Sequence, residues 1–577
     1  MDLADLFQTA CGNFGEIPND WMSATQVRPI IFEDPALIWL EYYGDRYGFR
    51  PDESPYEFLK FIGRKGFEFQ EKYGKEVMPA APSVCKGPWE VRRAEKLQET
   101  LELMGQGVPV ICQPALWWAP ERIYGVPDFL VLTSWLKEKF PEVLKPGEDQ
   151  AAAMNLKHTA TLGHYVVLDV KFTTKLEESQ KATDFANYRA QVRVYSFLAG
   201  KLQGFMPKRG FMATRDHPFD PLAVDIFSSL DGPLDEDLAA IREKFIEIKT
   251  NGGKYTPWKD EIVVSNFSNE DERWDTAKDI IAHEKIPGRD PEVVYQISRS
   301  VKRELAQLGF ANLDMMLKID PANVPLEKCK GIGPKRAKQI RSILKANRSR
   351  TPVVPNAVLV PKAKEFEFYV DFEYFTNVNV DFETQWPTLE GYEMIFMVGV
   401  GWEERGDWKF ETFISSAEKP DEERRMIEAF LGVLQTRTNG AFLDGSRAVY
   451  YHWSSAEVWQ GTRAADRHGF PKDHPLRRLP WSDLQKVFVD GPASIPGAWN
   501  FKLKEVAKAL SAVHAAFATE WPGDLDKGLR AMVMGWNAYK EADPLKSHEM
   551  GLLKAYLEAD CKALWNILRW LRTACKP

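Results

Sequence analysis

The alternation of apolar and polar residues is clearest in the stretch Phe366–Phe375, and it predicts a β-strand. Aromatic and β-branched residues dominate this stretch, and Pro355 and Pro361 precede it. Because alternate residues of a strand point to the same face, Asp371 and Glu373 share one face. Two neighbouring carboxylates repel each other and lose hydration unless a cation joins them. The pattern therefore leaves two interpretations, a cation site or a solvated sheet edge.

Downstream of this strand, the pattern is typical of a mixed α/β domain. It predicts two more strands, a helix, a further strand and the start of another helix, at residues 393–402, 408–414, 421–435, 448–453 and 454–457. The last helix contains Tyr556 and Asp560. These two residues are four positions apart, so they lie on the same helix face. We therefore expect several polar groups of this domain to meet.

The N-terminal part of the chain shows a second α/β pattern. Apolar residues at helical spacing between positions 28 and 78 predict two helices, and three candidate strands follow at residues 108–112, 125–132 and 165–172. A helix containing Tyr188–Tyr195 comes next. This order of elements predicts a small sheet covered by helices.

Chemically useful side chains lie on these N-terminal elements. Asp169 and Lys171 share a strand face, and Asp128 follows a Gly-x-Pro turn on a neighbouring strand. Two carboxylates can hold Mg²⁺ against a phosphate, while a lysine can orient the attacking water. Gln191 and Tyr195 are four residues apart on one helix, so both can reach the same site. An ordinary hairpin with a surface Asp/Lys pair is the alternative.

Between these parts, residues 251–350 predict helices joined by polar loops. The segment Gly331-Ile-Gly333-Pro forms a turn that feeds a helix, and such a turn exposes backbone N–H groups to an anion. The cations that remain beside the apolar stripe of this helix are Lys335, Arg336, Lys338 and Arg341. Residues 328–350 include nine Lys or Arg and no acid. The segment therefore predicts either a phosphate-binding element or a basic solvated helix.

Composition and length limit the class of protein. The 577 residues suggest about three or four domains. The net charge of −8 means that nucleic acid would have to bind at local basic patches. The six cysteines form no C-x-x-C pair, which predicts reduced thiols and neither disulfides nor a zinc site. We find no signal-peptide core, no membrane-length apolar run and no P-loop, and we expect a cytoplasmic or nucleoid-associated protein without a membrane partner.

Taken together, the N-terminal motifs resemble the RecB-like branch of the PD-(D/E)xK nucleases. The motifs G-x-x-D, D-x-K and Q-x-x-x-Y occur in the family's order within residues 28–250. The resemblance implies a restriction-endonuclease-like core in which Asp128 and Asp169 hold one or two metal ions. It further implies catalytic roles for Lys171, Gln191 and Tyr195.

Two departures from this family bear on the N-terminal site. Relatives place an acid or a His on the first helix, where this chain has Gln70, with Glu68 and Glu71 out of register. The cysteines of the iron–sulfur members have no counterpart here, since no Cys lies between Cys112 and Cys329. We therefore expect no iron–sulfur cluster, and a weakened nuclease site or a clamp that has lost catalysis are both open.

The C-terminal motifs resemble the DEDD exonucleases of ribonuclease-H-like fold, in their tyrosine subtype. The order is D-x-E, an acid at a strand-to-helix turn, and Y-x-x-x-D. The resemblance implies that two Mg²⁺ or Mn²⁺ ions are held by the acids Asp371, Glu373, Glu457 and Asp560. Tyr556 would position the water. The third acid is Glu457 where Asp is commoner in the superfamily, and Asp483 is a competing candidate.

The middle segment, residues 326–344, is similar to a helix-hairpin-helix motif, which binds the DNA backbone without reading its sequence. The expected order is a RecB-like domain, a helical domain with this motif, an extended Pro-rich linker and a DEDD domain, at residues 1–250, 251–350, 351–364 and 365–577. This order resembles a group of RecB-family nucleases, some of which are fused to helicases.

We therefore expect a metal-dependent 3′–5′ exonuclease that acts on single-stranded DNA, with a second, RecB-like site. A separate helicase or a repair or defence protein is the expected further partner. The alternatives are an RNA exonuclease and a DNA-binding scaffold whose RecB-like domain is catalytically weak.

Overall fold

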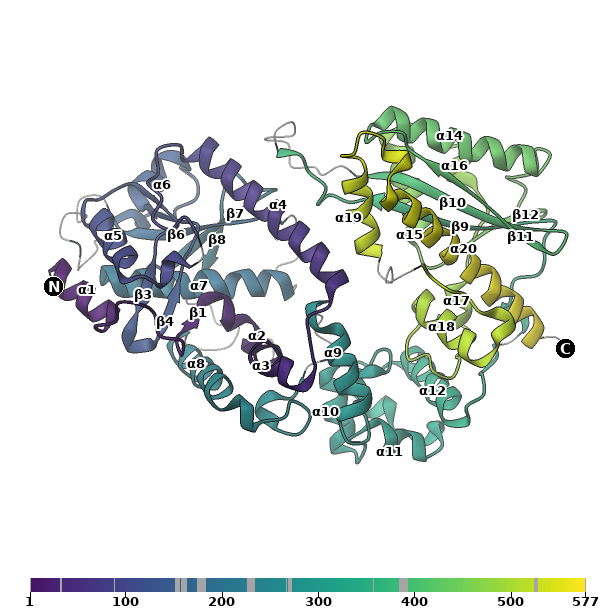
Figure 1. Ribbon diagram of the computed structural model, residues 1–577, viewed down its shortest axis with the longest axis horizontal. Coiled ribbons are helices and arrows are strands. Elements are labelled where there is room, and N and C mark those ends of the chain that lie inside the picture. The colour runs from purple at the N-terminus through teal and green to yellow at the C-terminus, as the bar shows by residue number, and fades with distance from the viewer. Residues whose placement is uncertain are drawn as a thin grey trace. The chain divides into compact units, whose positions relative to one another are not determined.

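The computed structural model describes residues 2–575 with the exception of 32–33, 88, 151–155, 157–162, 174–182, 226–233, 266, 268–271, 356, 383–392 and 523–527. Its contacts divide the chain into two compact units (Figure 1). Unit 1 consists of Met1–Arg50, Ile62–Asn269 and Asp381–Leu389. Unit 2 consists of Pro51–Phe61, Glu270–Val380 and Glu390–Pro577.

The core of unit 1 is a five-stranded sheet in the order β2-β5-β6-β7-β8. Only β6 and β7 are parallel, and the other neighbours are antiparallel. Six of the seven residues of the central strand β6 are buried, which explains its nearly continuous apolar sequence. The strands are β2 (Val110–Cys112), β5 (Phe129–Leu132), β6 (Tyr165–Lys171), β7 (Arg209–Thr214) and β8 (Leu222–Asp225).

Helices and a smaller sheet surround this core. The small sheet has the order β1-β4-β3 and consists of β1 (Met22–Ser23), β4 (Ile123–Gly125) and β3 (Leu116–Trp118). From helix α4 (Glu53–Val77), Phe69 and Tyr73 place their rings against Phe172 and Phe129 beside the main sheet. The other helices are α1 (Leu3–Cys11), α2 (Val27–Ile31), α3 (Ala36–Tyr43), α5 (Ala94–Gly105), α6 (Thr133–Lys139), α7 (Thr183–Gln203) and α8 (Leu234–Asn251).

The central sheet of unit 2 also has five strands, in the order β11-β10-β9-β12-β13. Strands β9, β10 and β11 form an antiparallel meander, and β12 continues the sheet parallel to β9 and to β13. The strands are β9 (Phe366–Phe375), β10 (Met394–Glu404), β11 (Asp407–Ile414), β12 (Ala448–His452) and β13 (Trp481–Asp483).

Two apolar cores cover the two faces of this sheet. Phe368, Val370 and Phe372 of β9 belong to a core with helices α14 (Pro420–Arg437), α15 (Ala456–Arg467) and α16 (Pro475–Arg478). Tyr369 belongs to the other core, which includes α20 (His548–Ala574) and the helices of the middle segment. The remaining helices of unit 2 are α9 (Asp275–Ile280), α10 (Arg299–Gln307), α11 (Leu313–Lys318), α12 (Pro334–Ser349), α17 (Gln485–Val489), α18 (Leu503–Val513) and α19 (Gly528–Ala538).

The structure confirms most of the expected elements. It differs from the prediction in one divided strand, one additional strand and one docked point of the linker. The predicted strand 125–132 is divided into β4 and β5 around Pro127, because proline has no N–H for a ladder. The short strand β13 carried no sequence signal. Val353 exchanges backbone hydrogen bonds with Ser494, so the expected linker is docked at that point.

The four expected domain ranges stay a prediction, because the two compact units that the contacts define have other bounds. In the part of the chain that the structure describes, no helix has the length and apolarity to span a membrane.

Candidate functional site

Four acidic side chains from three elements of unit 2 meet on one face of its sheet. Asp371 and Glu373 come from β9, Glu457 from the first turn of α15, and Asp560 from α20. Glu373, Glu457 and Asp560 are buried, at 6% exposure or less. The structure therefore brings together all four acids that the C-terminal resemblance selects.

A glycine of β10 allows helix α20 to approach the strand that carries the first two acids. Gly399 lies opposite Asp371 in the β9–β10 ladder. A Cβ atom at Gly399 would stand only 2.7 Å from Cγ of Leu557, so a larger residue would push α20 away. Leu557 is one turn before Cys561 and adjacent in sequence to Tyr556, so the packing of this turn places the polar residues of α20 near β9.

Burial and mutual repulsion disturb the acid–base behaviour of this cluster. Burial raises the pKa of Asp371 well above its usual range, and the nearby carboxylates of Asp560 and Glu457 raise it further. The same two causes raise the pKa of Glu373. Burial raises the pKa of Glu457 to about 7, and its carboxyl group shares a hydrogen bond with that of Asp371.

The cluster fits a divalent cation by its chemistry. Its ligand atoms are all carboxylate oxygens, which Mg²⁺ and Mn²⁺ prefer. Among the described residues, however, no three His, Cys, Asp or Glu side chains stand as a ready-made metal cage. The carboxyl groups of Asp371 and Glu457 share a hydrogen bond, which holds a proton between two of the candidate ligands. Metal binding would therefore release a proton and require small movements of these side chains.

Tyr556 is fixed beside the acids by a network that the sequence did not reveal. Nζ of Lys504, on α18, donates a hydrogen bond to the Tyr556 hydroxyl at 2.9 Å. Burial raises the pKa of the Tyr556 phenol, and a hydrogen bond between Tyr556 and Asp560 raises it further. The indole N–H of Trp521 donates to Oδ1 of Asp560 at 2.7 Å. Lys504 and Trp521 therefore belong to the site, although neither lies in a motif.

The structure separates the two candidates for the third acid. Oδ1 of Asp483 accepts hydrogen bonds from the backbone N–H groups of Ser454 and Gln485, both at 2.9 Å. Ser454 has a φ of 72°, a conformation that non-glycine residues seldom adopt. Asp483 thus holds the turn that leads into α15, while Glu457 contacts Asp371 and lies 3.2 Å from Nδ1 of His452.

A second cluster of acids lies in unit 1, at the ends of β5 and β6. Oδ2 of Asp128 accepts a hydrogen bond from the backbone N–H of Val170 at 2.6 Å, and Oδ2 of Asp169 lies 2.7 Å from Nζ of Lys171. Burial and the neighbouring Asp169 raise the pKa of Asp128 well above its usual range. Burial alone would lower the pKa of Lys171, but Asp169 and Asp128 outweigh it and raise that pKa.

The helix α7 completes this cluster. Nζ of Lys171 donates to Oε1 of Gln191 at 3.0 Å, and Nε2 of Gln191 donates to the Tyr195 hydroxyl at 2.8 Å. A Cβ atom at Gly125 would stand 2.5 Å from a ring carbon of Tyr195, so the glycine of the G-x-x-D motif makes room for the tyrosine. All five residues that the N-terminal resemblance selects are therefore joined or adjacent.

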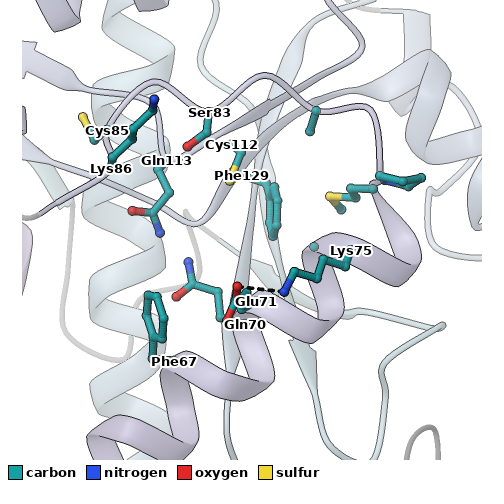
Figure 2. A pocket seen from close by; sticks show the side chains of 14 residues that line it. Phe67, Gln70, Glu71, Lys75, Ser83, Cys85, Lys86, Cys112, Gln113 and Phe129 are labelled. Atoms are coloured by element: carbon teal, nitrogen blue, oxygen red, sulfur yellow. Dashed lines mark ion pairs between the residues drawn. The ribbon is translucent and has the colours of Figure 1, made fainter. Parts of the chain in front are cut away.

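The first-helix candidates of this cluster have other contacts. Glu68 forms an ion pair with Lys65 at 2.7 Å, and Glu71 forms one with Lys75 at 2.8 Å. Gln70 lines a pocket instead (Figure 2). Glu68 and Glu71 thus pair with lysines of their own helix.

The basic turn of unit 2 also has the expected shape. Gly331 has a φ of 86°, and Gly333 precedes Pro334 at the start of α12. Lys335, Arg336 and Lys338 are exposed. Lys335 lies 2.8 Å from Asp490. Arg341 differs from the other three cations, because it pairs with Glu327 and donates to the carbonyl groups of Pro321 and Val324.

Comparison with known proteins concerns the C-terminal part of the chain. Residues 378–572 match the family model of the RNase_H superfamily. The match includes Glu457, Tyr556 and Asp560, and it begins just after the strand that carries Asp371 and Glu373. No curated protein and no solved structure matches the chain.

The C-terminal part of the chain is thus an RNase H-like domain. Such a domain indicates a nuclease activity and a nucleic-acid substrate, and nucleases of this kind generally use divalent metal ions. The match covers about a third of the chain, and the part of unit 1 that it includes is the short segment Asp381–Leu389.

Proposed function

We propose that the protein is a metal-dependent exonuclease that removes nucleotides from the 3′ end of single-stranded DNA. The observation that carries this proposal is the cluster of four acids on one sheet face, three of them buried and Asp371 partly buried, with Tyr556 hydrogen-bonded at its edge. Among the described residues, Lys504 lowers the pKa of Glu373 and of Asp560, but burial keeps both raised, so this cation does not balance the charge of the cluster. Buried acids that repel each other are typical of sites that bind metal ions.

The residues of this site have separate tasks in phosphodiester hydrolysis. Asp371, Glu373, Glu457 and Asp560 would hold the metal ions, which supply Lewis acidity toward the phosphate and a nucleophilic water. The Tyr556 hydroxyl would orient the attacking water. Lys504 holds that hydroxyl and adds a positive charge where negative charge grows in the transition state.

The preference for a single strand rests on an energetic argument. A paired end must be frayed before a single terminal nucleotide can enter such a site, at a cost of about 1.4 kcal/mol per base-pair step. The sequence contains no P-loop motor to supply this work. The 3′–5′ direction follows from the resemblance to the DEDD exonucleases.

Unit 1 is proposed to carry a second, RecB-like nuclease site with a smaller activity. The linked contacts of Asp169, Lys171 and Gln191 support it, since they join a metal-binding acid to a lysine and a positioned amide. The alternative is that unit 1 serves as a clamp without catalysis. The glutamine at position 70, where relatives have an acid or a His, favours that alternative.

The basic turn before α12 is proposed to bind the DNA backbone as a helix-hairpin-helix motif. Backbone N–H groups at the start of the helix, together with Lys335, Arg336 and Lys338, would contact phosphates. Arg341 has a different role in this proposal, because its bonds to Glu327 and two carbonyl groups hold the hairpin together.

Digestion of end-labelled nucleic acids tests the proposed function. Single-stranded DNA, double-stranded DNA and RNA would each be incubated with Mg²⁺, with Mn²⁺ and with excess EDTA. We expect a descending ladder from 5′-labelled single-stranded DNA, faster than from blunt duplexes and absent in EDTA. Immediate release of the 5′ label as a mononucleotide would contradict the direction. Faster digestion of RNA would favour the RNA exonuclease.

A further inference from the structure

A pocket with a volume of about 320 Å³ opens in unit 1 between helix α4, the segment that follows it and the adjoining ends of β2 and β5 (Figure 2). It is separate from the chain of contacts that links Asp169 to Tyr195. A volume of this size lies at the lower end of the range for small-molecule sites. It suits one planar ring system and is too small for a base pair.

Backbone contacts tie this pocket to the carboxylate cluster of unit 1. The N–H of Gln113 donates to the carbonyl oxygen of Asp128 at 2.8 Å, and the N–H of Cys85 donates to the carbonyl oxygen of Gln113 at 3.1 Å. In the sheet, Cys112 pairs with Phe129, and Phe129 pairs with Leu168. The pocket therefore lies at the same end of strands β2, β5 and β6 as Asp128 and Asp169.

The lining of the pocket combines an aromatic ring with amides. Phe67 is 64% exposed, so its ring is accessible to a ligand that enters the pocket. Figure 2 shows the side-chain amides of Gln70 and Gln113 directed toward each other across the pocket. Gln113 has a φ of 50°, a strained conformation of the kind found at functional sites. Each amide offers both donors and an acceptor, as the edge of a nucleobase requires.

Other occupants suit this lining less well. Burial raises the pKa of Cys85 to about 12 and raises that of Cys112, so both thiols are neutral and poor metal ligands or nucleophiles. A phosphate would meet the carboxylate of Glu71, which lines the pocket and already pairs with Lys75. A neutral, planar group with several hydrogen-bonding atoms meets neither obstacle.

We propose that this pocket binds one unpaired nucleobase of a DNA strand whose backbone lies at Asp128, Asp169 and Lys171. The base would stack on Phe67 and receive hydrogen bonds from Gln70 and Gln113. Stacking on an aromatic side chain accepts every base, so the pocket selects single strands and not a sequence. This inference rests on the proposed nucleic-acid binding by unit 1, but it does not require that unit 1 cleaves.

Photo-crosslinking of the full-length chain tests the pocket directly. Single-stranded DNA that contains 5-iodouracil at successive positions would be irradiated with the protein in buffer with Ca²⁺ in place of Mg²⁺, so that a cation can join the phosphate to Asp128 and Asp169. Crosslinked peptides would be identified by mass spectrometry. We expect a crosslink in the peptide that contains Phe67, and its loss in Phe67→Ala. The matched control is Phe14→Ala, because Phe14 is 44% exposed in the same unit and does not line the pocket.

Binding of an abasic strand supplies the second measurement. With the unmodified protein, an abasic site at the crosslinking position should weaken binding roughly tenfold, as expected for one lost stacking contact. In Phe67→Ala this difference should largely disappear, and Gln113→Ala should reduce it. Both variants should retain the melting temperature of the parent protein.

The outcomes distinguish the pocket from the proposed nuclease function. A crosslink at Phe67 without any cleavage by unit 1 supports the pocket and the clamp alternative together. Cleavage that depends on Asp169 but proceeds without a crosslink in residues 67–86 overturns the pocket alone. Equal crosslinking by Phe67→Ala and the parent protein, or equal loss in Phe14→Ala, overturns it as well.

Discussion

The two acidic clusters of this protein neutralise their charge in different ways. In unit 1, the ammonium group of Lys171 lies 2.7 Å from Asp169 and joins the acids to helix α7. In unit 2, burial raises the pKa of all four acids, and Asp371 and Glu457 share a hydrogen bond. Lys504 of unit 2 hydrogen-bonds to Tyr556 and lowers the pKa of Glu373 and of Asp560, but burial keeps the pKa of both acids raised.

This difference teaches that the two clusters depend on cations from solution to different degrees. In unit 1, the ion pair with Lys171 neutralises part of the charge of the acids within the protein. A cluster of four acids without such an ion pair must take up protons or divalent cations to stay buried. We therefore expect the site of unit 2 to respond more strongly to metal concentration, pH and loss of a single acid.

The largest expected effect concerns Asp371. Asp371→Ala removes an acid from the centre of the cluster, and loss of such a metal ligand typically costs several kcal/mol of transition-state stabilisation. This corresponds to roughly a thousandfold slower release of nucleotides from a 3′ end. The measurement is the rate of ladder formation from 5′-labelled single-stranded DNA with Mg²⁺.

Asp169→Ala is the matched variant in unit 1. It should leave the ladder intact and remove only a smaller, endonucleolytic activity. If Asp169→Ala abolished the ladder while Asp371→Ala kept it, the ranking of the two clusters would be reversed.

The next largest effect concerns Lys504 and Tyr556. Removing a hydrogen bond to a charged group costs about 1.5–3 kcal/mol, so Tyr556→Phe and Lys504→Met should each slow the ladder by roughly ten- to a hundredfold. Because the two groups form one hydrogen bond, the double variant should be little slower than either single variant. Lys508→Met, on the exposed side of the same helix, is the control. Additive losses in the double variant would show that the two residues act independently.

The sequence predicts much of the C-terminal site because its spacings are local. The alternation along β9 places Asp371 and Glu373 on one face, and four residues separate Tyr556 from Asp560 on α20. The contact of Lys504 with Tyr556 spans 52 residues, and that of Trp521 with Asp560 spans 39. Such contacts depend on how α18 and a loop pack against α20, and no local pattern encodes them.

The same limit explains the other differences between prediction and structure. The sequence favours Glu457 as the third acid with Asp483 as the competing candidate, and only the fold shows that Asp483 is bound to the backbone of Ser454. Arg341 belongs to a basic run, but its partner Glu327 lies before the turn and neutralises it. Pro127 is visible in the sequence, yet its effect on strand length depends on the pairing of β5.

A smaller effect is expected at the basic turn of unit 2. Each lost phosphate contact reduces the dependence of log affinity on log salt by about one, so Lys335→Ala together with Arg336→Ala should lower the slope by about two. The loss of affinity should be similar for different DNA sequences. Arg341→Ala should instead lower the melting temperature, because it breaks the pair with Glu327. An unchanged salt slope in the double variant would make the turn a structural element.

The smallest expected effect is on stability, and it tests the comparison of the clusters most directly. The pKa of Glu457 is raised to about 7 in the folded chain, above its value of about 4.3 when unfolded. The folded state therefore binds the extra proton, and this contribution to stability is lost as the pH rises from about 4.3 through about 7.

In metal-free buffer, the melting temperature of the transition that includes unit 2 should fall by roughly a few degrees between pH 5 and pH 8. Added Mg²⁺ should restore it at pH 8, because cations replace the protons. Asp371→Asn removes one repelling charge and should flatten the dependence, whereas Asp169→Asn should leave it unchanged. A melting temperature that is independent of pH and metal would mean that the acids of unit 2 are neutralised within the protein, as those of unit 1 are.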